Sequence, residues 1–474
     1  MSTLQTAQPS ATGDRLKTRE YVGYALGDTA SNLFFQTFNI FLTYYYVDIW
    51  GISAAVLLWM MPIVRIIGSL DDPIIGLVAD RTNTRWGKFR PYLLWGAIPY
   101  GLCGYLTFAG PGFGPAGKIV YAYVTYALML TSYSVINVPY SSLLGVISPS
   151  SRTRAVASSF RFVGAFSGAL LISMLVRPLV RRLGGANEAG QVNYVLGFRW
   201  TMAIFAVASV IMFWITFATT RERVTPPPGQ KSDVREELGE LFRNWPWVTM
   251  LIASIFSTTF TALRAGSTLF YFKYVVGDDG KPILLGLDRS TIFLTVGSLG
   301  LVFGTACLGT IARKIDKKHC AVVLSVITGV CFGAFYFLPR DWYGVMLALN
   351  VLAQFAAGPT SALTWALYGD VADYGEWKFG RRSTGLVYSA SLFAIKTGMV
   401  VGGFLLPLFL DQFGYVKDAT QTGPALLGIT LAFSIVPGVI ALLKAGAIMM
   451  YPLNQKRVDE IEQELAARRA VATA

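Results

Sequence analysis

The sequence predicts an all-α membrane protein whose twelve transmembrane helices form two six-helix bundles, with both termini in the cytoplasm. The 474 residues are 54% hydrophobic and only 14% charged, whereas soluble domains carry roughly 25% charged residues. Apolar runs recur along the whole chain, near the length of about 20 residues that a helix needs to cross a bilayer. Basic residues gather in alternate segments between these runs, which is the pattern that sets membrane topology.

The apolar runs fall into two groups of six. The first group lies near 25–49, 54–79, 92–110, 118–147, 156–181 and 197–219. The second group lies near 246–275, 290–312, 320–338, 343–368, 384–411 and 423–450. Three consecutive prolines from Pro226 separate the groups, and prolines interrupt a helix because they lack the backbone N–H. We therefore expect an N-terminal tail (1–24), a first bundle (25–219), a linker (220–245), a second bundle (246–450) and a C-terminal tail (451–474).

The basic residues of the loops predict the orientation of the helices. The loops after the second, fourth, eighth and tenth runs and the linker are rich in Lys and Arg, as at Arg81 and Arg85. The other loops contain few of them, with a mild exception around Arg177, Arg181 and Arg182. Because basic loops stay on the cytoplasmic side, both termini are expected there. The absence of an Asn-x-Ser/Thr sequence agrees with a bacterial inner membrane.

The composition argues against several other classes of protein. The net charge of +13 is spread over short loop clusters, so it indicates topology and not a nucleic-acid partner. One histidine and four scattered cysteines give neither zinc spacing nor a disulfide framework. No GxxxxGK[ST] phosphate loop occurs. We expect a protein without enzymatic activity or cofactor that works as a monomer in the lipid bilayer.

Polar residues inside the apolar runs are the candidates for function, because they are costly to bury in a membrane. The first helix carries a polar stripe with spacings of four, four and three residues, made of Asp28, Asn32, Gln36 and Asn39. This stripe indicates either the wall of a cavity or hydrogen bonding between helices. On the fourth helix, one face carries Tyr133, Asn137, Tyr140 and Ser141, with Ser134 beside it.

Charged residues on other helices add a second set of candidates. Asp71 and Asp72 are adjacent at mid-membrane depth, where they can bind a hard cation or take up a proton. An alternative is a structural pair between Asp72 and Arg65. Lys396 is either the counter-charge of a carboxylate on another helix or a hydrogen-bond donor to a substrate. Lys273 is expected to extend toward the membrane interface.

Arg161 on the fifth helix needs a partner, either a carboxylate or an anionic or hydroxylated ligand. Aromatic residues near such groups include Tyr133, Tyr140, Trp365 and Tyr388. Aromatic rings beside hydroxyl-binding groups are common in sugar sites. The same residue types also line lipid-facing surfaces and membrane interfaces, so the rings alone are a weak signal.

Four segments carry a pattern that extends beyond single residues. They are RIIGSLDDPIIGLVADRTNTRWGKFRPYLLWG (65–96), DVADYGEWKFGRRSTG (370–385), GDTASN (27–32) and INVPYSSL (136–143). These segments resemble the glycoside–pentoside–hexuronide:cation symporters, a family of the major facilitator superfamily, and the resemblance covers all twelve spans in order. It implies the fold of that superfamily, in which two bundles rock around a central site.

The resemblance also implies roles for individual residues. It assigns cation coupling to Asp71, Asp72 and Ser134, while a further helix 2 carboxylate of the family falls on Gly68. For the substrate site, it implies roles for Tyr133, Arg161, Trp365 and Lys396. Together with polar residues at or near the family's other site positions and on the polar stripe, the expected substrate site is Asp28, Asn32, Tyr133, Asn137, Ser141, Arg161, Trp365, Ser391 and Lys396. The implied cytoplasmic gate contains Asp80, Arg81, Asp370, Asp373 and Arg382. The coupling ion is H⁺ or Na⁺, and Asp72 and Asp71 bind a metal ion only if it is Na⁺.

These expectations combine into one functional hypothesis. We expect a secondary active transporter, a cation-coupled sugar or glycoside symporter that works by alternating access. The sugar is neutral or acidic, because Arg161 and Lys396 are also able to bind a carboxylate or sulfonate. Two alternatives stay open: a lipid or amphiphile carrier with the same fold, and a membrane sensor that does not transport.

Overall fold

The protein is all-α throughout the residues that the structure describes. The computed structural model describes residues 16–148, 151–185, 192–223, 239, 241–284, 286–311, 316–379 and 384–473. Within these ranges the only β-type pairings are two isolated bridges, Thr84 with Gly87 and Leu284 with Leu287. The predicted fold class is therefore confirmed for the described part of the chain.

The helices follow the predicted apolar runs closely. In the N-terminal half they are α1 (Thr18–Thr37) with the π-helical segments η1 (Phe38–Leu42) and η2 (Tyr45–Ile49), α2 (Ala54–Arg81), α3 (Arg90–Trp95), α4 (Ala97–Thr107), α5 (Pro115–Val146), α6 (Ser151–Gly184) and α7 (Tyr194–Thr219). In the C-terminal half they are α9 (Trp245–Phe270) with η3 (Tyr271–Val276), α10 (Arg289–Ile311), α11 (Lys317–Ala334) with η4 (Phe335–Phe337), α12 (Tyr343–Phe379), α13 (Thr384–Gln412), α14 (Gly423–Phe433), α15 (Ile435–Met449) and α16 (Gln455–Thr473).

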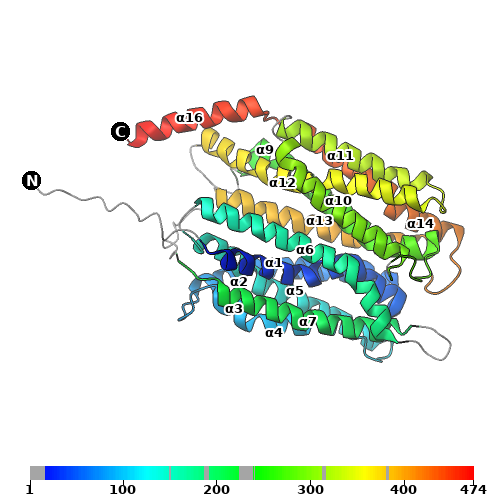
Figure 1. The fold of residues 1–474 in the computed structure, drawn as a ribbon. Helices are drawn as coiled ribbons and strands as arrows, with labels where there is room; N and C mark the ends of the chain where they lie inside the picture. The colour runs from blue at the N-terminus through cyan, green and yellow to red at the C-terminus, as the bar shows by residue number, and fades with distance from the viewer. Residues whose placement is uncertain are drawn as a thin grey trace, which may run out of the picture.

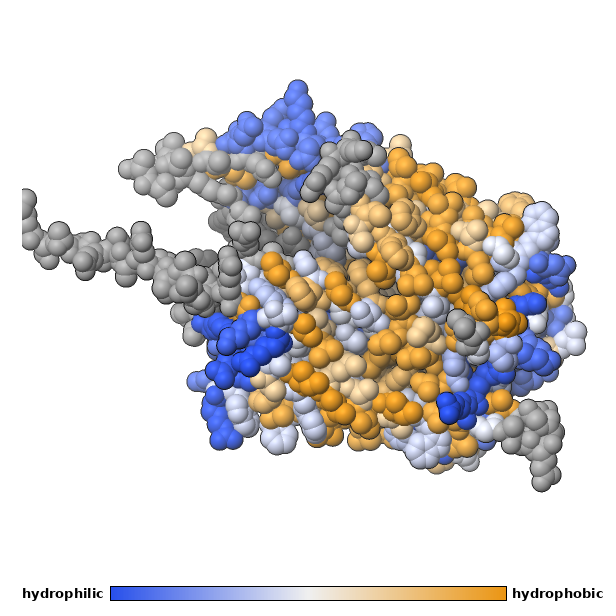
Figure 2. Space-filling model, in the orientation of Figure 1, coloured by the Kyte–Doolittle hydropathy of each residue, from blue (hydrophilic) through white to orange (hydrophobic). Residues whose placement is uncertain are grey.

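Nine helices in the described ranges are long and apolar enough to cross a membrane, and the start of α2 (54–68) is a shorter apolar helix. The helix α1 is not among the nine, because its polar stripe lowers its hydropathy. Figure 2 shows an apolar band across the middle of the molecule, with polar side chains at both ends. The fold is thus that of a multi-pass membrane protein, while the count of twelve spans stays a prediction.

The helices pack as two bundles (Figure 1). In the N-terminal bundle α1 packs on α6 and α7, and in the C-terminal bundle α9 packs on α13 and α15. Small residues permit the closest of these contacts: a Cβ atom at Gly164 would lie 2.2 Å from the backbone oxygen of Ala25, and one at Gly398 would lie 2.4 Å from that of Ile255. The first and fifth runs of each half therefore pair in the same way, which supports the internal symmetry of the fold.

In the described part of the chain, the most extensive contacts between the two bundles involve three pairs of helical segments. These are α2 with α13, α6 with α10, and η1 with α9. The start of α1 and the helix α16 lie toward one end of the molecule, and η2 and the loop after η3 lie toward the other (Figure 1). We call this second end the distal end. The functional residues are distributed between the bundle interior and these two ends.

Candidate functional site

A guanidinium group connects three helices inside the N-terminal bundle. Arg161 on α6 forms an ion pair with Asp28 on α1, with 3.4 Å between Nε and Oδ2. Its Nη2 atom also donates to the hydroxyl of Ser141 on α5, at 3.3 Å. The guanidinium carbon lies 5.1 Å from the centre of the Tyr140 ring. Arg161 thus has a carboxylate partner, one of the alternatives that the sequence left open, and it also donates to the hydroxyl of Ser141.

The polar stripe of α1 continues this site toward α5. Ser31 donates to Oδ1 of Asn137 at 3.0 Å, and Asn32 donates to the backbone oxygen of Asp28 at 2.9 Å. The amide Nδ2 of Asn137 is buried and has no hydrogen-bond partner among the described residues. An unsatisfied donor in an apolar interior is costly, so Nδ2 of Asn137 is suited to meet a hydroxyl group of a ligand.

Tyr133 supplies an aromatic surface on the same helix, α5. Its ring stacks on that of Phe35, with 5.9 Å between the centroids and 26° between the planes. It also lies 6.4 Å from the ring of Tyr100. Polar groups beside a stacked aromatic surface match a ligand that has both hydroxyl groups and an apolar face.

The two adjacent carboxylates of α2 point to different helices. Asp72 accepts a hydrogen bond from Lys396 on α13, across the two bundles, and each of these side chains is 30% exposed. Asp71 accepts from the hydroxyl of Thr131 on α5, at 2.5 Å. Successive residues on a helix are rotated by roughly 100°, which explains why neighbouring carboxylates serve different partners. Lys396 is therefore the counter-charge of a carboxylate, as one of the two sequence interpretations predicted.

Close packing around Gly68 leaves little room for the further helix 2 carboxylate that the family has at this position. A Cβ atom at Gly68, one turn earlier on α2, would lie 2.9 Å from Cβ of Leu130 on α5. A larger residue at position 68 would push these helices apart. Ser134 is buried and donates to the backbone oxygen of Gly68 at 3.4 Å. Arg65 donates to the hydroxyl of Tyr126 and to the backbone oxygen of Met399 on α13.

The candidate residues of the C-terminal bundle form a separate group. Trp365 on α12 is half-buried and meets the ring of Tyr368 edge-on, at 6.1 Å. Tyr368 also shares a hydrogen bond of 2.7 Å with Ser254 on α9. Ser391 is fully buried, and its hydroxyl donates to the backbone oxygen of Val387 at 2.6 Å. The structure thus joins Lys396 to the α2 carboxylates, whereas the contacts described for Trp365 and Ser391 remain within their own bundle.

The residues of the expected cytoplasmic gate are only partly described. Asp370 on α12 accepts from Nζ of Lys317 on α11 through both oxygens, at 3.1 Å each. Asp373 is half-buried on α12, and Arg81 is exposed at the end of α2. The side chain of Asp80 and all of Arg382 lie outside the described residues. The gate therefore stays a prediction.

The sequence interpretation missed a cluster of ion pairs at the distal end. Asp48 on η2 is buried and accepts from Nζ of Lys273 on η3 at 2.5 Å, and also from the hydroxyls of Tyr274 and Tyr415. Lys273 therefore pairs with the other bundle at the distal end, and its expected extension toward the membrane interface stays a prediction. Both partners are charged residues near run ends, but their pairing leaves no local signal in the sequence.

In a second contact at the distal end, the basic residue belongs to the N-terminal bundle and the acidic residues belong to the C-terminal half. Arg177 on α6 pairs with Asp288, at 2.6 Å, and lies 3.9 Å from Asp278; both acids belong to the loop between η3 and α10. Arg177 belonged to the basic residues that broke the topology pattern. This exception was thus a usable signal, because a basic residue at the non-cytoplasmic end of a helix does not serve the topology pattern and needs another partner.

Comparison with known proteins identifies the family. A family model described as MFS/sugar transport protein matches residues 23–455. The chain belongs to this family. The transporter is 34% identical over 461 residues to the "Putative glycoside/cation symporter YagG" of Escherichia coli (strain K12), which covers 96% of each chain. It is 33% identical over 469 residues to the isoprimeverose transporter of Lactiplantibacillus pentosus, covering 96% of this chain and 93% of that one.

A solved structure shows the same fold at low sequence identity. The crystal structure of a D-xylose–proton symporter aligns with a TM-score of 0.59 and 14% identity, covering 92% of this chain and 96% of that one. The family match and the relatives confirm the resemblance to the glycoside–pentoside–hexuronide:cation symporters of the major facilitator superfamily. The protein is a membrane transporter and not an enzyme.

Proposed function

We propose that the transporter is a cation-coupled symporter of a sugar or glycoside in the bacterial inner membrane, and that it works by alternating access. The observation that carries this proposal is the contact between Lys396 on α13 and Asp72 on α2, beside the second carboxylate Asp71. Because this contact joins the two bundles, a cation that binds to the carboxylates alters the interaction between them. The sugar-transport family and the relatives support the substrate class.

The coupling follows from the balance of charges. In the described state Lys396 neutralises Asp72. A proton or sodium ion at Asp71 and Asp72 competes with Lys396 for the carboxylate oxygen atoms. The hydroxyl group of Thr131, which already bonds Asp71, and that of Ser134 are the proposed further ligands of a sodium ion. The released ammonium group of Lys396 is then free to donate to a hydroxyl group of the sugar. Cation and sugar therefore each increase the affinity for the other, as reciprocal coupling requires.

The charges of the sugar site favour a neutral substrate. Asp28 balances Arg161, and Asp72 balances Lys396, so the site has no excess positive charge for a carboxylate to neutralise. An acidic sugar would have to displace Asp28 from Arg161. The proposed sugar contacts are Asp28, Asn32, Tyr133, Asn137, Ser141, Arg161, Trp365, Ser391 and Lys396.

The proposal includes a topology of twelve spans with both termini in the cytoplasm. The bundles then comprise residues 25–219 and 246–450, joined by the linker 220–245, and the distal end faces the periplasm. In this orientation the ion pairs of Asp48 and Arg177 hold the periplasmic side closed. Asp80, Arg81, Asp370, Asp373 and Arg382 are the proposed gate of the cytoplasmic side, and the functional unit is a monomer.

The first test is binding to the purified protein. Neutral glycosides, pentoses and sugar acids are titrated with and without sodium and at two pH values. We expect a neutral sugar to bind, with an affinity that increases with sodium if Na⁺ is the coupling ion and with acidity if H⁺ is. Failure of every sugar to bind would contradict the proposal and favour an amphiphile carrier.

Transport by variants then tests the cation site. Asp72→Asn removes the charge that the cation neutralises, so uphill sugar accumulation in proteoliposomes should fall to the passive level. Asp411→Asn makes the same charge change at the exposed end of α13 and should accumulate sugar like the native protein. Uphill accumulation of sugar by the Asp72 variant at the native rate would contradict the proposed coupling.

A further inference from the structure

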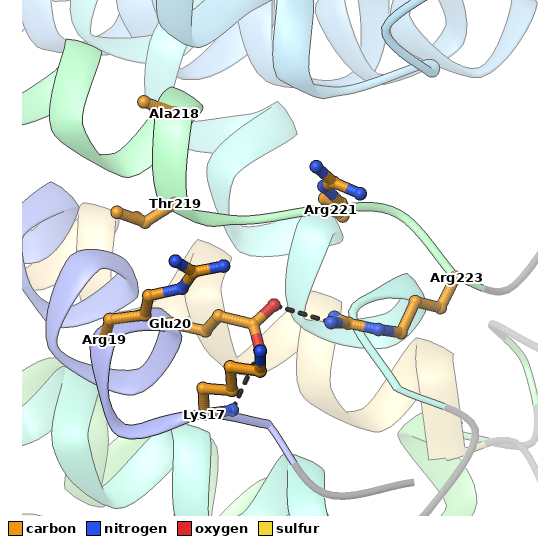
Figure 3. A pocket seen from close by; sticks show the side chains of 7 residues that line it. All are labelled: Lys17, Arg19, Glu20, Ala218, Thr219, Arg221 and Arg223. Carbon is orange, nitrogen blue, oxygen red and sulfur yellow. Dashed lines mark hydrogen bonds and ion pairs between the residues drawn. The ribbon is translucent and has the colours of Figure 1, made fainter. Parts of the chain in front are cut away.

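A cavity with basic walls opens where α1 begins and α7 ends. Its volume is about 300 Å³, and it is lined by Lys17, Arg19, Glu20, Ala218, Thr219, Arg221 and Arg223. Figure 3 shows that these side chains come from the start of α1, the end of α7 (Ala218 and Thr219) and the extended stretch that follows α7 (Arg221 and Arg223). Neither the proposed sugar site nor the proposed cation site uses any of these residues.

The one acidic residue that lines the cavity, Glu20, already has a basic partner. Glu20 pairs with Arg223 at 2.6 Å and accepts from the backbone nitrogen of Lys17 at 2.8 Å (Figure 3). Burial raises the pKa of the Glu20 carboxyl, but the bonds from Arg223 and Lys17 outweigh burial and leave the pKa below its ordinary value. Glu20 is therefore ionised at neutral pH, and its charge is cancelled by Arg223.

Three positive charges remain without a counter-charge. Lys17, Arg19 and Arg221 are exposed, and no ion pair joins them to an acid among the residues for which the structure gives side chains. Three cations of the same sign around one cavity repel one another. An anion in the cavity relieves this repulsion.

The cavity wall is held in a fixed position by neighbouring segments. The backbone nitrogen of Arg223 donates to the oxygen of Val146 at 2.7 Å, and its Nη1 atom donates to the oxygen of Ile147 at 3.1 Å. Glu222 accepts from the backbone nitrogens of three successive residues that begin at Lys88, at 2.8–3.1 Å. The basic groups are therefore carried on a pre-formed wall.

The position of the cavity favours one source of anion. Directly beyond it α1 and α7 are in contact, where Thr216 donates to the backbone oxygen of Gly23 at 2.8 Å. The outer surfaces of these helices expose the apolar residues Val22, Ile211 and Ile215. Basic groups at the end of an exposed apolar strip lie where the headgroup of a phospholipid meets its acyl chains.

We propose that this cavity binds a phosphate group through Lys17, Arg19 and Arg221. Arginine pairs with phosphate through two parallel N–H bonds, which suits the two arginines. The lipid-facing position favours the phosphodiester of an anionic phospholipid, and a soluble phosphate ester has the same chemistry. In the proposed orientation the ligand belongs to the cytoplasmic leaflet.

The test measures lipid binding to the full-length protein in detergent by native mass spectrometry. Dioleoyl phosphatidylglycerol is titrated against dioleoyl phosphatidylcholine, and glycerol 3-phosphate is the soluble competitor. Arg19→Ala combined with Arg221→Ala should weaken phosphatidylglycerol binding about 25-fold, because each basic residue near an anionic headgroup contributes about fivefold. Arg243→Ala combined with Lys456→Ala removes the same charge from exposed positions of the C-terminal half and should change binding less than twofold.

The outcomes separate the two sources of phosphate. Loss of phosphatidylglycerol binding only in the Arg19 and Arg221 variant supports a lipid headgroup. Binding of glycerol 3-phosphate that depends on the same arginines, without a preference for phosphatidylglycerol, supports a soluble ester. Equal loss in both double variants, or no loss in either, overturns the site. The sugar-binding titration is independent of these results, so this proposal and the symport proposal fail separately.

Discussion

Lys396 on α13 donates a hydrogen bond to Asp72 on α2, so that a charge from one bundle occupies the carboxylate of the other. The second carboxylate, Asp71, is bonded within its own bundle by Thr131. Of the two acids, Asp72 therefore has a described hydrogen-bond partner that moves away when the bundles separate. This difference makes the Lys396–Asp72 pair the point at which cation binding and bundle movement are linked.

Removal of Lys396 should strengthen cation binding. Lys396→Met leaves Asp72 without its described counter-charge, and opposite charges in contact near a protein surface attract by about 4 kcal/mol. Part of this attraction is lost to solvent at a site that is 30% exposed. We expect the affinity for the coupling cation to increase about tenfold, which corresponds to about 1.4 kcal/mol. Titration of the purified protein with sodium and with acid measures this affinity.

The control for this prediction is Lys281→Met. Lys281 is a lysine at the distal end whose side chain is 80% exposed, so its loss should leave cation affinity unchanged. An unaltered affinity in the Lys396 variant would mean that the cation does not compete with Lys396.

A disulfide that joins α6 to α10 should stop sugar transport. Ser173 on α6 and Ser298 on α10 belong to different bundles, and their Oγ atoms are 2.9 Å apart. Ser173→Cys with Ser298→Cys, in a background without Cys103, Cys307, Cys320 and Cys331, should form a disulfide on oxidation. The disulfide holds α6 and α10 together, so sugar uptake should cease and return with a reductant.

Each single cysteine variant serves as the control and should transport sugar under both conditions. Continued uptake by a fully cross-linked protein would contradict the idea that α6 and α10 separate during transport.

We expect Arg264 to stabilise the folded protein, because a proline on another helix leaves a backbone carbonyl without its helical donor. Pro437 on α15 lacks the N–H that would bond the backbone oxygen of Phe433, and Arg264 on α9 donates to that oxygen instead. The guanidinium carbon also lies 3.8 Å from the centre of the Phe433 ring. Arg264→Met should lower the free energy of unfolding by about 2 kcal/mol, because it leaves a buried carbonyl without a donor.

A second substitution makes this explanation testable. Pro437→Ala supplies a backbone N–H to the oxygen of Phe433, so it should restore part of the stability that Arg264→Met removes. Denaturation of the single and double variants in detergent measures the difference. If Pro437→Ala gives the Arg264 variant no advantage, Arg264 acts through its aromatic contacts and not through the carbonyl.

The ionised carboxylate of Asp316 should stabilise the C-terminal helix α16 at neutral pH, and this contribution should be lost in acid. Its carboxylate accepts from the backbone nitrogens of Lys318 at 2.8 Å and of Gln455, the first residue of α16, at 2.7 Å. Burial raises the pKa of Asp316, but these bonds outweigh burial and leave the pKa below its ordinary value. A group whose pKa is lowered by folding contributes stability above its unfolded pKa of about 3.9, and this contribution is lost as pH falls through the folded value.

Asp316→Asn should therefore lower the melting temperature at pH 7 and have a smaller effect as the pH falls below about 4. Asp341→Asn, a change at an exposed acid, should have little effect at either pH. A loss of stability that does not vary with pH would show that the charge of Asp316 is not what holds α16.

Several features of the protein could be predicted because they are local. The apolar runs predicted most helix ends to within a few residues, since the hydropathy of about 20 consecutive residues is enough to identify a span. The exceptions are α1, which begins seven residues before its run, and α12, which continues eleven residues beyond its run. The spacing of Asp28 and Asn32 placed them on one face of α1, because helical periodicity is a property of neighbouring residues. The cost of charge in a membrane identified Arg161 and Lys396 as residues that need partners.

The partners themselves were not predictable in this way. Arg161 meets Asp28 across 133 residues of sequence, and Lys396 meets Asp72 across 324. Lys273 was expected near the membrane interface, and its bond to Asp48, 225 residues away, was not foreseen. Nothing in the chain near any of these residues encodes the identity of the other, because only the packing of separate helices, within one bundle or between the two, brings them together.

The sequence by itself thus determined which helices form, which of them carry charge into the membrane and which family the segments resemble. Only the tertiary structure decided that Lys396 neutralises Asp72 while Asp71 is bonded by Thr131, and that the distal end is held by Asp48 and Lys273. The physical reason is that hydrophobicity and helical periodicity act over one or two turns of chain, whereas an ion pair depends on the distance between atoms of separate helices.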